Sequence, residues 1–295
     1  MRFERGVALV QVLIISLILT TLAVFVSQTV SQQVKIGEKV KKAFELQLKL
    51  ERGEARLLQK LLSNQFVRQP NSLDAFVKNW NFHGEPFNVG SDVTYEIQDL
   101  SSLISLNKLY VPTARQVLRE LNVGEQHLNT FVSSVIDWVD KDNNAQTNGA
   151  EYTFYKTQGR NGPRNGYLQS FDEITFIQGA EHLSLNSLEK YFSIELTAGF
   201  NPLNAPDIVL SAFVNNESVA KQLIELREEG KLNRYQFYLL TGRDDDEFLT
   251  FSPGRKLRIK ISVTNKEQMI SKQFIASFTP RNYRQPVTIT SVKWN

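Results

Sequence analysis

One stretch of the sequence, from Asp140 to Glu151, combines side chains that could bind a metal ion. Counted from Asp140 as position one, oxygen-bearing side chains fall at positions three, five, seven, nine and twelve: Asp142, Asn144, Gln146, Asn148 and Glu151. Calcium-binding loops use this spacing, with a backbone carbonyl at position seven and a two-oxygen carboxylate at position twelve. Position six is Ala145 where such loops carry glycine. A solvated turn rich in Asn and Asp is the alternative interpretation.

Other candidate groups are weaker. Asp137 precedes the stretch and is either a further ligand or a hydrogen-bonding neighbour of Trp138. The acidic run 244–247 is typical of a solvated turn, and the glycine-rich segment 159–166 lacks the ending of a phosphate-binding loop, so we expect a flexible loop there. The histidines share no metal-binding or catalytic spacing, and we expect surface or hydrogen-bonded side chains: His83, His127 and His182.

Composition excludes several classes of protein. The chain has 295 residues, 41% of them hydrophobic, which is enough for one large or two modest cores. Its 34 Lys and Arg against 31 Asp and Glu give a net charge of +3, too small a bias to predict nucleic-acid binding. The absence of cysteine excludes disulfides and thiolate chemistry. Since no catalytic motif stands out, we expect no enzyme.

An uncharged, mainly apolar run lies near the start of the sequence. No residue from Gly6 to Val34 is charged, and the run is long enough for one helix to cross a bilayer. A cleaved secretory signal is the alternative, because Arg2 and Arg5 precede the run, but no convincing small-residue cleavage site follows it. We therefore expect a retained anchor. The lysines beyond the run leave its orientation undecided by charge alone.

The helical pattern continues past the membrane-spanning length. Apolar residues recur at roughly helical spacing without an intervening proline: Ile36, Val40, Ala43, Leu46, Leu50, Leu57 and Leu61. The sequence therefore predicts one long helix, half in lipid and half emerging from it. Gly53 interrupts the stripe, and we expect either a bend or a close contact there.

The chain beyond the long helix is predicted to form a globular α+β structure. Alternating apolar residues predict four strands, which come from distant parts of the chain: 92–98, 256–263, 269–278 and 287–294. A short helix is expected within 71–80, capped by Asn71 or Ser72. Further helices are expected at 114–121 with Thr113 as cap, at 125–139, from 204–207 to 213, and at 218–229 before Gly230. The helices would form an all-α body inserted into an α/β domain.

These features carry a family resemblance. The opening Met1–Gly6, followed by Val7–Gln11 at the start of the apolar run, resembles a type IV prepilin signal. Five later stretches then occur in the order found in the K-type minor pseudopilins of the type II secretion system: 104–107, 137–142, 148–151, 170–174 and 200–205. The chain thus resembles that family over most of its length.

The resemblance implies a processing route and a location. Prepilin peptidase would cleave between Gly6 and Val7, and Val7 would become the methylated first residue. The short N-terminus would lie in the bacterial cytoplasm, the apolar helix would span the inner membrane once, and the remaining chain would be periplasmic. This assigns the orientation that the charge count left open.

The resemblance also implies a domain plan. A pilin-like α/β domain with an antiparallel sheet would be interrupted by a large all-α insertion. We expect the following parts in order: a leader at 1–6, a transmembrane helix at 7–27, a helix extension with the first part of the pilin-like domain at 28–102, the helical insertion at 103–243, and the C-terminal β part at 244–295.

A departure from the family pattern bears on the place of this subunit in the filament. Most members carry glutamate at the fifth mature position, where this chain has Gln11. That carboxylate is thought to pair with the terminal amine of the subunit above, offsetting the cost of a charge in lipid. A subunit with nothing above it has no such amine to meet. Gln11 therefore suits the filament tip, where the K type is placed.

Partners and metal follow from the same resemblance. The I and J types would be the partners, with the H type as a further candidate, and the subunit would cap and nucleate the pseudopilus. The family binds calcium in its helical domain, which favours the metal interpretation of 140–151 with the Asp140, Asp142, Asn144 and Glu151 side chains and the Gln146 carbonyl as ligands. The alternative function is a single-span envelope protein that binds exported substrates or other periplasmic ligands.

Overall fold

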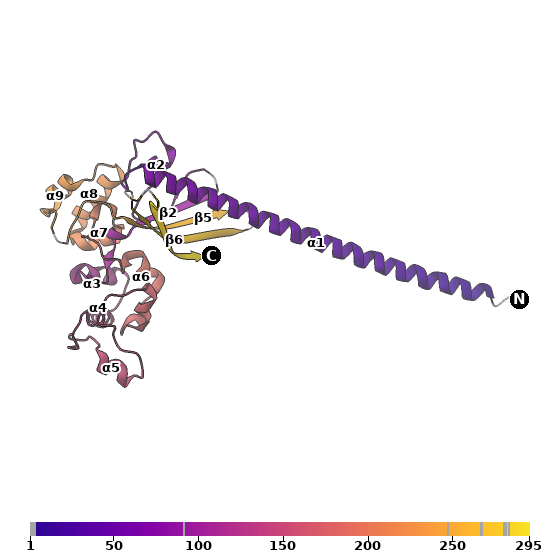
Figure 1. The fold of residues 1–295 in the computed structure, drawn as a ribbon, viewed down its shortest axis with the longest axis horizontal. Coiled ribbons are helices and arrows are strands. Elements are labelled where there is room, and N and C mark those ends of the chain that lie inside the picture. The colour runs from indigo at the N-terminus through magenta and orange to yellow at the C-terminus, as the bar shows by residue number, and fades with distance from the viewer. Residues whose placement is uncertain (1–3, 91, 247, 266–267, 280–281, 283) are drawn as a thin grey trace.

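A single long helix projects from a globular body (Figure 1). The structure, a computed structural model, describes residues 4–90, 92–246, 248–265, 268–279, 282 and 284–295. Helix α1 runs from Glu4 to Ser63 without a break, a length of about 90 Å. The predicted long helix is therefore confirmed, while residues 1–3 of the expected leader lie outside the described residues.

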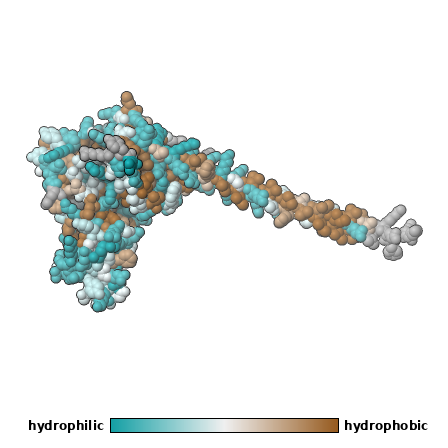
Figure 2. Space-filling view, viewed as in Figure 1, coloured by the Kyte–Doolittle hydropathy of each residue, from teal (hydrophilic) through white to brown (hydrophobic). Residues whose placement is uncertain are grey.

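The outer part of α1 is apolar and uncovered. Apolar side chains dominate it in the space-filling view, whereas hydrophilic side chains appear along the helix nearer the body and cover much of the body's surface (Figure 2). Among the described residues, α1 is the one helix long and apolar enough to cross a membrane. Burial begins at Leu46, where α1 reaches the body.

The C-terminal part of α1, from Leu46 onward, packs on a five-stranded antiparallel sheet. Its strands follow the order β1-β2-β5-β6-β7: β1 (Phe87–Asn88), β2 (Val93–Asp99), β5 (Lys256–Thr264), β6 (Met269–Phe278) and β7 (Val287–Trp294). The four predicted strands are thus confirmed. As expected, β2 pairs with a strand more than 150 residues away, with Ile97 opposite Ile259.

One core joins α1 to this sheet. Alternate residues of β5 and β6 face inward and are buried, in keeping with the two-residue period of a strand. They meet the sheet-facing leucines of α1, all at most 2% exposed: Leu46, Leu50, Leu57 and Leu61. Burial of each leucine contributes about 1.5–3 kcal/mol, so this stripe fixes α1 to the sheet.

Gly53 marks a close contact between α1 and the sheet. A Cβ atom at this position would lie 2.9 Å from the Tyr95 hydroxyl oxygen and 3.3 Å from a methyl group of Val93. The helix is continuous through Gly53, so the glycine permits close approach instead of causing a bend. Next to it, Glu54 forms a largely buried ion pair with Lys272 of β6 at 2.6 Å.

The globular body has two parts: the sheet with the C-terminal end of α1, and a second part that is mainly helical and is called the helical body below. Its helices are α3 (Val111–Glu120), α4 (Glu125–Val139), α5 (Tyr152–Thr157), α6 (Leu185–Tyr191), α7 (Asp207–Val214), α8 (Glu217–Glu228) and α9 (Arg234–Thr241). They enclose a separate core whose buried members run from Ile104 to Leu249. The body also contains a short parallel pair, β3 (Ile104–Ser105) with β4 (Phe192–Ser193). The domain boundaries given above stay predictions.

Two expected helix starts were wrong. The short helix α2 is Ala75–Asn79, and its cap is Asp74, which accepts hydrogen bonds from the N–H groups of Phe76 and Val77. Asp74 also pairs with Lys60 of α1, a tertiary contact that the local pattern does not show. Helix α3 begins at Val111 instead of Ala114, because a proline is favoured in the first turn of a helix and here occupies position 112.

The start of α7 also differs from expectation. Asn204 was expected to open this helix, but it lies in a 3-10 turn, Pro202–Asn204, and α7 begins at Asp207. The Asn204 amide is used elsewhere, because its Nδ2 donates to the carboxylate of Asp99 at 3.0 Å. A long-range contact therefore decides the role of this residue.

Asp99 joins the two bodies. It lies at the end of β2, is fully buried, and accepts hydrogen bonds from Asn201 and Asn204 of the helical body at 3.1 and 3.0 Å. The backbone N–H of Gly254, just before β5, donates to the same oxygen at 3.0 Å. Ser101 donates both its N–H and its hydroxyl to the other oxygen. One carboxylate thus connects the sheet with the helical body.

Candidate functional site

The predicted metal-binding stretch forms the connection between α4 and α5. Helix α4 ends at Val139, and the N–H of Asp140 still donates to the Ile136 carbonyl at 2.9 Å. The loop turns at Asn148, whose positive φ of 67° is a conformation that Asn tolerates better than most residues. Glu151 then caps α5 by accepting the N–H of Tyr152. The two ends of the loop, Asp140 and Glu151, therefore lie close together.

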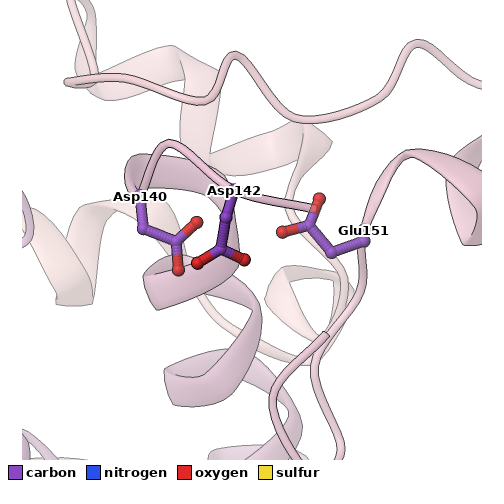
Figure 3. Close-up of side chains that lie close together, drawn as sticks. All are labelled: Asp140, Asp142 and Glu151. Carbon is purple, nitrogen blue, oxygen red and sulfur yellow. The ribbon is translucent and has the colours of Figure 1, made fainter. Parts of the chain in front are cut away.

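This path brings three carboxylates together. Asp140, Asp142 and Glu151 each place one oxygen so that all three oxygens lie within 4.8 Å of one another. Figure 3 shows the three side chains converging from the end of α4, the loop and the start of α5. Glu151 is buried, Asp140 is half-buried and Asp142 is exposed. The group could hold a metal ion.

The electrostatics of the group disfavour three free carboxylates. Burial, followed by the charge of Asp142, raises the pKa of Asp140. Burial is also the main cause that raises the pKa of Glu151, with further contributions from the nearby acidic side chains. Like charges this close repel each other in a low-dielectric setting. A cation bound between the three carboxylates would offset their repulsion and favour their ionised forms.

Two oxygens of the group have no partner in the protein. Asp140 Oδ1 and Glu151 Oε1 are buried and form no hydrogen bond with any described residue. Buried carboxylate oxygens are normally hydrogen-bonded or bound to metal. An all-oxygen donor set of this kind fits a hard divalent cation. The donor atoms of these residues therefore suit the calcium ion that the sequence predicted at this loop.

Asp137 has a different position from these three carboxylates. It is fully buried on α4 and accepts the N–H of Gln146 at 3.0 and 3.2 Å, with a further backbone hydrogen bond from Ala150. A Cβ on Gly149 would lie 2.0 Å from its carboxylate. Burial raises the pKa of Asp137, and these hydrogen bonds only partly oppose that effect. Asp137 therefore holds the loop in shape, and its part as a ligand stays a prediction.

The other predicted ligands are less converged. The Gln146 carbonyl accepts the N–H of Gly149 at 2.8 Å, and the Asn144 N–H donates to Asp142 Oδ1 at 2.7 Å. Both side chains are exposed. Their place in the ligand set stays a prediction.

Sequence reasoning missed Asn165. Its Nδ2 donates to the Asp142 carbonyl at 2.7 Å and to Asn143 Oδ1 at 3.0 Å. The segment 159–166, expected to be a flexible loop, thus closes over the acidic loop, and Arg164 anchors it through an ion pair with Glu173 at 2.9 Å. No local pattern signals this long-range contact.

The second acidic run forms a turn, as expected. Asp244 and Asp245 pair with Arg234 at 2.6 and 3.4 Å. Asp246 accepts the N–H groups of Phe248 and Leu249. Residue 247 lies outside the described residues. The three described carboxylates are thus engaged with protein groups.

The histidines show one arrangement that the sequence did not suggest. His127 and His182 are 55 positions apart, yet their ring centroids lie 3.7 Å from each other at the surface. His83 is buried, and burial together with the charges of Arg227 and Arg68 lowers its pKa to about 3. It is therefore neutral at physiological pH.

The predicted processing and filament residues lie on α1. Gly6, Val7 and Gln11 fall within its first turns, and Gln11 is exposed. They are far along the chain from the acidic loop, so the processing signal and the candidate metal site are separate features of the molecule.

Comparison with known proteins agrees with this architecture. Residues 94–195, which include the acidic loop, match the family model for type II secretion system protein K. No curated protein matches the sequence. A chain in the crystal structure of the GspK-GspI-GspJ complex from the enterotoxigenic Escherichia coli type 2 secretion system has the same fold, with a TM-score of 0.53 and 13% identity over 86% of this chain and 99% of that one. Over residues 94–195 the chain is therefore similar to type II secretion system protein K, and its fold is similar to that of a chain of the GspK-GspI-GspJ complex.

Proposed function

We propose that this protein is a minor pseudopilin that caps the pseudopilus tip together with I-type and J-type subunits and nucleates its assembly. It would thereby serve the export of folded proteins across the outer membrane, as a structural subunit. The family match and the fold shared with a chain of the GspK-GspI-GspJ complex support this role. The observation that carries it is an apolar face of α1 that its own sheet leaves uncovered.

That face lies beyond the membrane-spanning length of the helix. Val30, Val34, Val40 and Phe44 are each more than half exposed. Phe44 precedes the first sheet-facing leucine, Leu46, by two positions, which places the two side chains about 200° apart around the helix. The exposed apolar face therefore points away from the sheet. An apolar stripe on a surface helix is stable in water only when another surface covers it.

Helices of neighbouring subunits would cover this face. Within the membrane, small and hydroxyl residues such as Ser16, Thr20 and Ala23 allow close helix approach. The hydroxyls of Ser16 and Thr20 donate to backbone carbonyls of their own helix, so they add no unsatisfied donor in lipid. Association would thus proceed along α1, from the inner membrane outward.

The tip position is supported by Gln11 and by the helical body. A neutral side chain at residue 11 needs no amine from a subunit above it. The helical body widens the globular end well beyond the sheet and α1 (Figure 1). We infer that this body leaves no room for another copy to stack on top.

Processing and location complete the proposal. Prepilin peptidase would cleave between Gly6 and Val7, and Val7 would be methylated. The mature chain would cross the inner membrane once with its globular part in the periplasm. The H type is a further candidate neighbour.

We infer that the acidic loop binds calcium as a structural ion. Asp140, Asp142 and Glu151 offer only oxygen donors, which suits calcium better than softer metals. The ion would bind the folded loop and stabilise it by mass action. Asp137 would hold the loop in the shape that binds it.

The assembly role can be tested with the full chain in detergent. Co-expressed with the I-type and J-type pseudopilins of the same system, it should be recovered in a complex with one copy of each, as measured by native mass spectrometry. Phe44→Glu should sharply reduce recovery, because it places a charge on the uncovered face. Gln32→Glu adds the same charge about 120° around the helix from Phe44, in line with the sheet-facing leucines, and should have little effect. Equal recovery of both variants would contradict the proposed surface.

A further inference from the structure

Two adjoining hollows form a groove on the helical body, separate from the acidic loop and from α1. One has a volume of about 50 Å³ and the other of about 690 Å³. They share Tyr110, Thr113 and Phe213. The groove lies where the start of α3 meets the end of α7, two helices that pack against each other, with the segment after α9 at its rim.

The smaller hollow is an aromatic pocket. The Phe213 ring lies 4.6 Å from that of Phe200 and 6.1 Å from that of Tyr110, measured between centroids. Phe248 forms an outer wall and is 45% exposed. Its segment is fixed, because the Phe248 carbonyl accepts the N–H of Phe200 at 2.7 Å. A preformed hollow of this size accepts a few water-sized groups, which corresponds to one apolar side chain.

The larger hollow is cationic. Arg115, Arg119 and Arg243 line it, and within the described part of the chain no aspartate or glutamate lines either hollow. Arg119 pairs with Glu125 outside the lining. The pKa of Glu125 is lowered mainly by its hydrogen bond from Arg119, with a smaller contribution from the charge of Arg115. Glu125 therefore balances the charge of Arg119. Arg115 and Arg243 are the two remaining guanidinium groups that could bind an anion.

Neither of those two groups forms a direct ion pair with a carboxylate of the described residues. Arg115 Nε is buried and forms no hydrogen bond within the described residues. Arg243 donates to the Phe213 carbonyl at 3.2 Å and to the Tyr110 hydroxyl at 3.3 Å, and its guanidinium lies 4.3 Å from the centroid of the Phe213 ring. Among the residues that the structure describes, neither arginine forms an ion pair. Two cations that line the larger hollow, one of them held against the Phe213 ring of the aromatic pocket, thus present unused capacity for an anion.

We propose that this groove binds an extended segment of another protein in which an apolar side chain neighbours a carboxylate. The apolar side chain enters the aromatic pocket, and the carboxylate meets Arg243 and Arg115 at its mouth. Arg favours such contacts because its planar fork matches a carboxylate. Neither lining contains a residue of α1, so this binding differs from the helix contacts proposed for tip assembly and extends the protein's role to recognition of a partner.

The test uses the full chain in detergent micelles and fluorescein-labelled octapeptides followed by fluorescence anisotropy. The probe contains one phenylalanine flanked by aspartates in a Gly-Ser background. Two matched peptides replace the aspartates by lysine or the phenylalanine by alanine. The acidic aromatic peptide should bind, and each matched peptide should bind roughly tenfold more weakly or worse. Equal binding of the lysine peptide, or no binding of the acidic one at millimolar concentration, would overturn the proposal.

Variants then locate the binding site. Arg243→Gln and Arg115→Gln should each weaken binding of the acidic peptide about tenfold, and Phe248→Ala should weaken it without disturbing the fold, since that ring is half-exposed. Arg255→Gln removes an exposed arginine outside the groove and serves as the control. If the three groove variants bind the peptide as tightly as the unaltered protein and the Arg255→Gln control do, the groove is not the site.

Discussion

Replacing Glu151 by glutamine should abolish most of the thermal stabilisation that calcium gives this protein. Glu151 is the buried member of the acidic group, and one of its oxygens has no partner in the protein. An ion at about one hundred times its dissociation constant stabilises the folded state by about 2.7 kcal/mol. For a domain of this size that shifts the melting temperature by roughly 5–10 °C. The unaltered protein should show this shift, and the variant should not.

The variant should behave oppositely without metal. In the metal-free protein, Glu151 is a carboxylate with a raised pKa among like charges, so its ionised form destabilises the fold at neutral pH. Glutamine removes that charge, and the metal-free variant should melt at the same temperature as the unaltered protein or higher. Asp172→Asn, at an exposed site outside the loop, should leave both melts unchanged. Identical curves for the unaltered protein with calcium and with chelator would remove the metal proposal.

The same stabilisation should shrink with acidity. The pKa values of Asp140 and Glu151 are raised, chiefly by burial, so protons compete with the ion at a higher pH than for ordinary carboxylates. In the metal-free protein, protonation relieves the repulsion, which favours the fold as the pH falls toward these raised values. Both effects narrow the gap between the calcium and chelator melts as the pH falls from neutral toward the raised pKa values.

Replacing Asp99 by alanine should cost about 3–5 kcal/mol of unfolding free energy. The change leaves the buried donors of Ser101, Asn201, Asn204 and Gly254 without their acceptor. Each unsatisfied buried donor costs about 1–3 kcal/mol, with partial compensation when several relax together. Because this carboxylate joins the two bodies, the loss should also weaken their cooperative unfolding. Urea titration of the full chain in detergent should show a lower midpoint and a broader or two-step transition.

Ser102→Ala provides a matched control for this prediction. Ser102 lies three residues away and is fully buried, but its hydroxyl has no hydrogen-bond partner among the described residues. Its removal should change the unfolding free energy by less than about 1 kcal/mol. If Asp99→Ala is no more destabilising than Ser102→Ala, the carboxylate does not connect the two bodies.

The sheet and α1 were predictable because their patterns are local and periodic. Every second residue of β5 is buried, and the leucine stripe of α1 repeats at helical spacing, so single segments carry the information. The boundaries that failed depend on contacts from elsewhere. Asp74 caps α2 while pairing with Lys60, and Asn204 leaves the helix start to reach Asp99. Such choices are decided by tertiary contacts that no local window contains.

In the candidate site, too, local spacing predicted some features, whereas tertiary contacts decide the others. The spacing of Asp140, Asp142 and Glu151 anticipated three carboxylates that the fold brings within 4.8 Å. The role of Asp137 in fixing the loop and the closure by Asn165 arise from the path of the backbone, which spacing does not specify. The groove between α3 and α7 was likewise invisible, because its cations and aromatic rings come from segments more than 100 residues apart.

The mass of the mature N-terminal peptide tests the central claim most directly. The protein would be purified from the membranes of cells that contain the prepilin peptidase of the same system, digested, and measured by mass spectrometry. A prepilin-type subunit should begin at a methylated Val7, with the apolar helix retained. A chain that keeps Met1 through Gly6, or one cut beyond the apolar run, would contradict the account of a pilus-tip subunit anchored through α1.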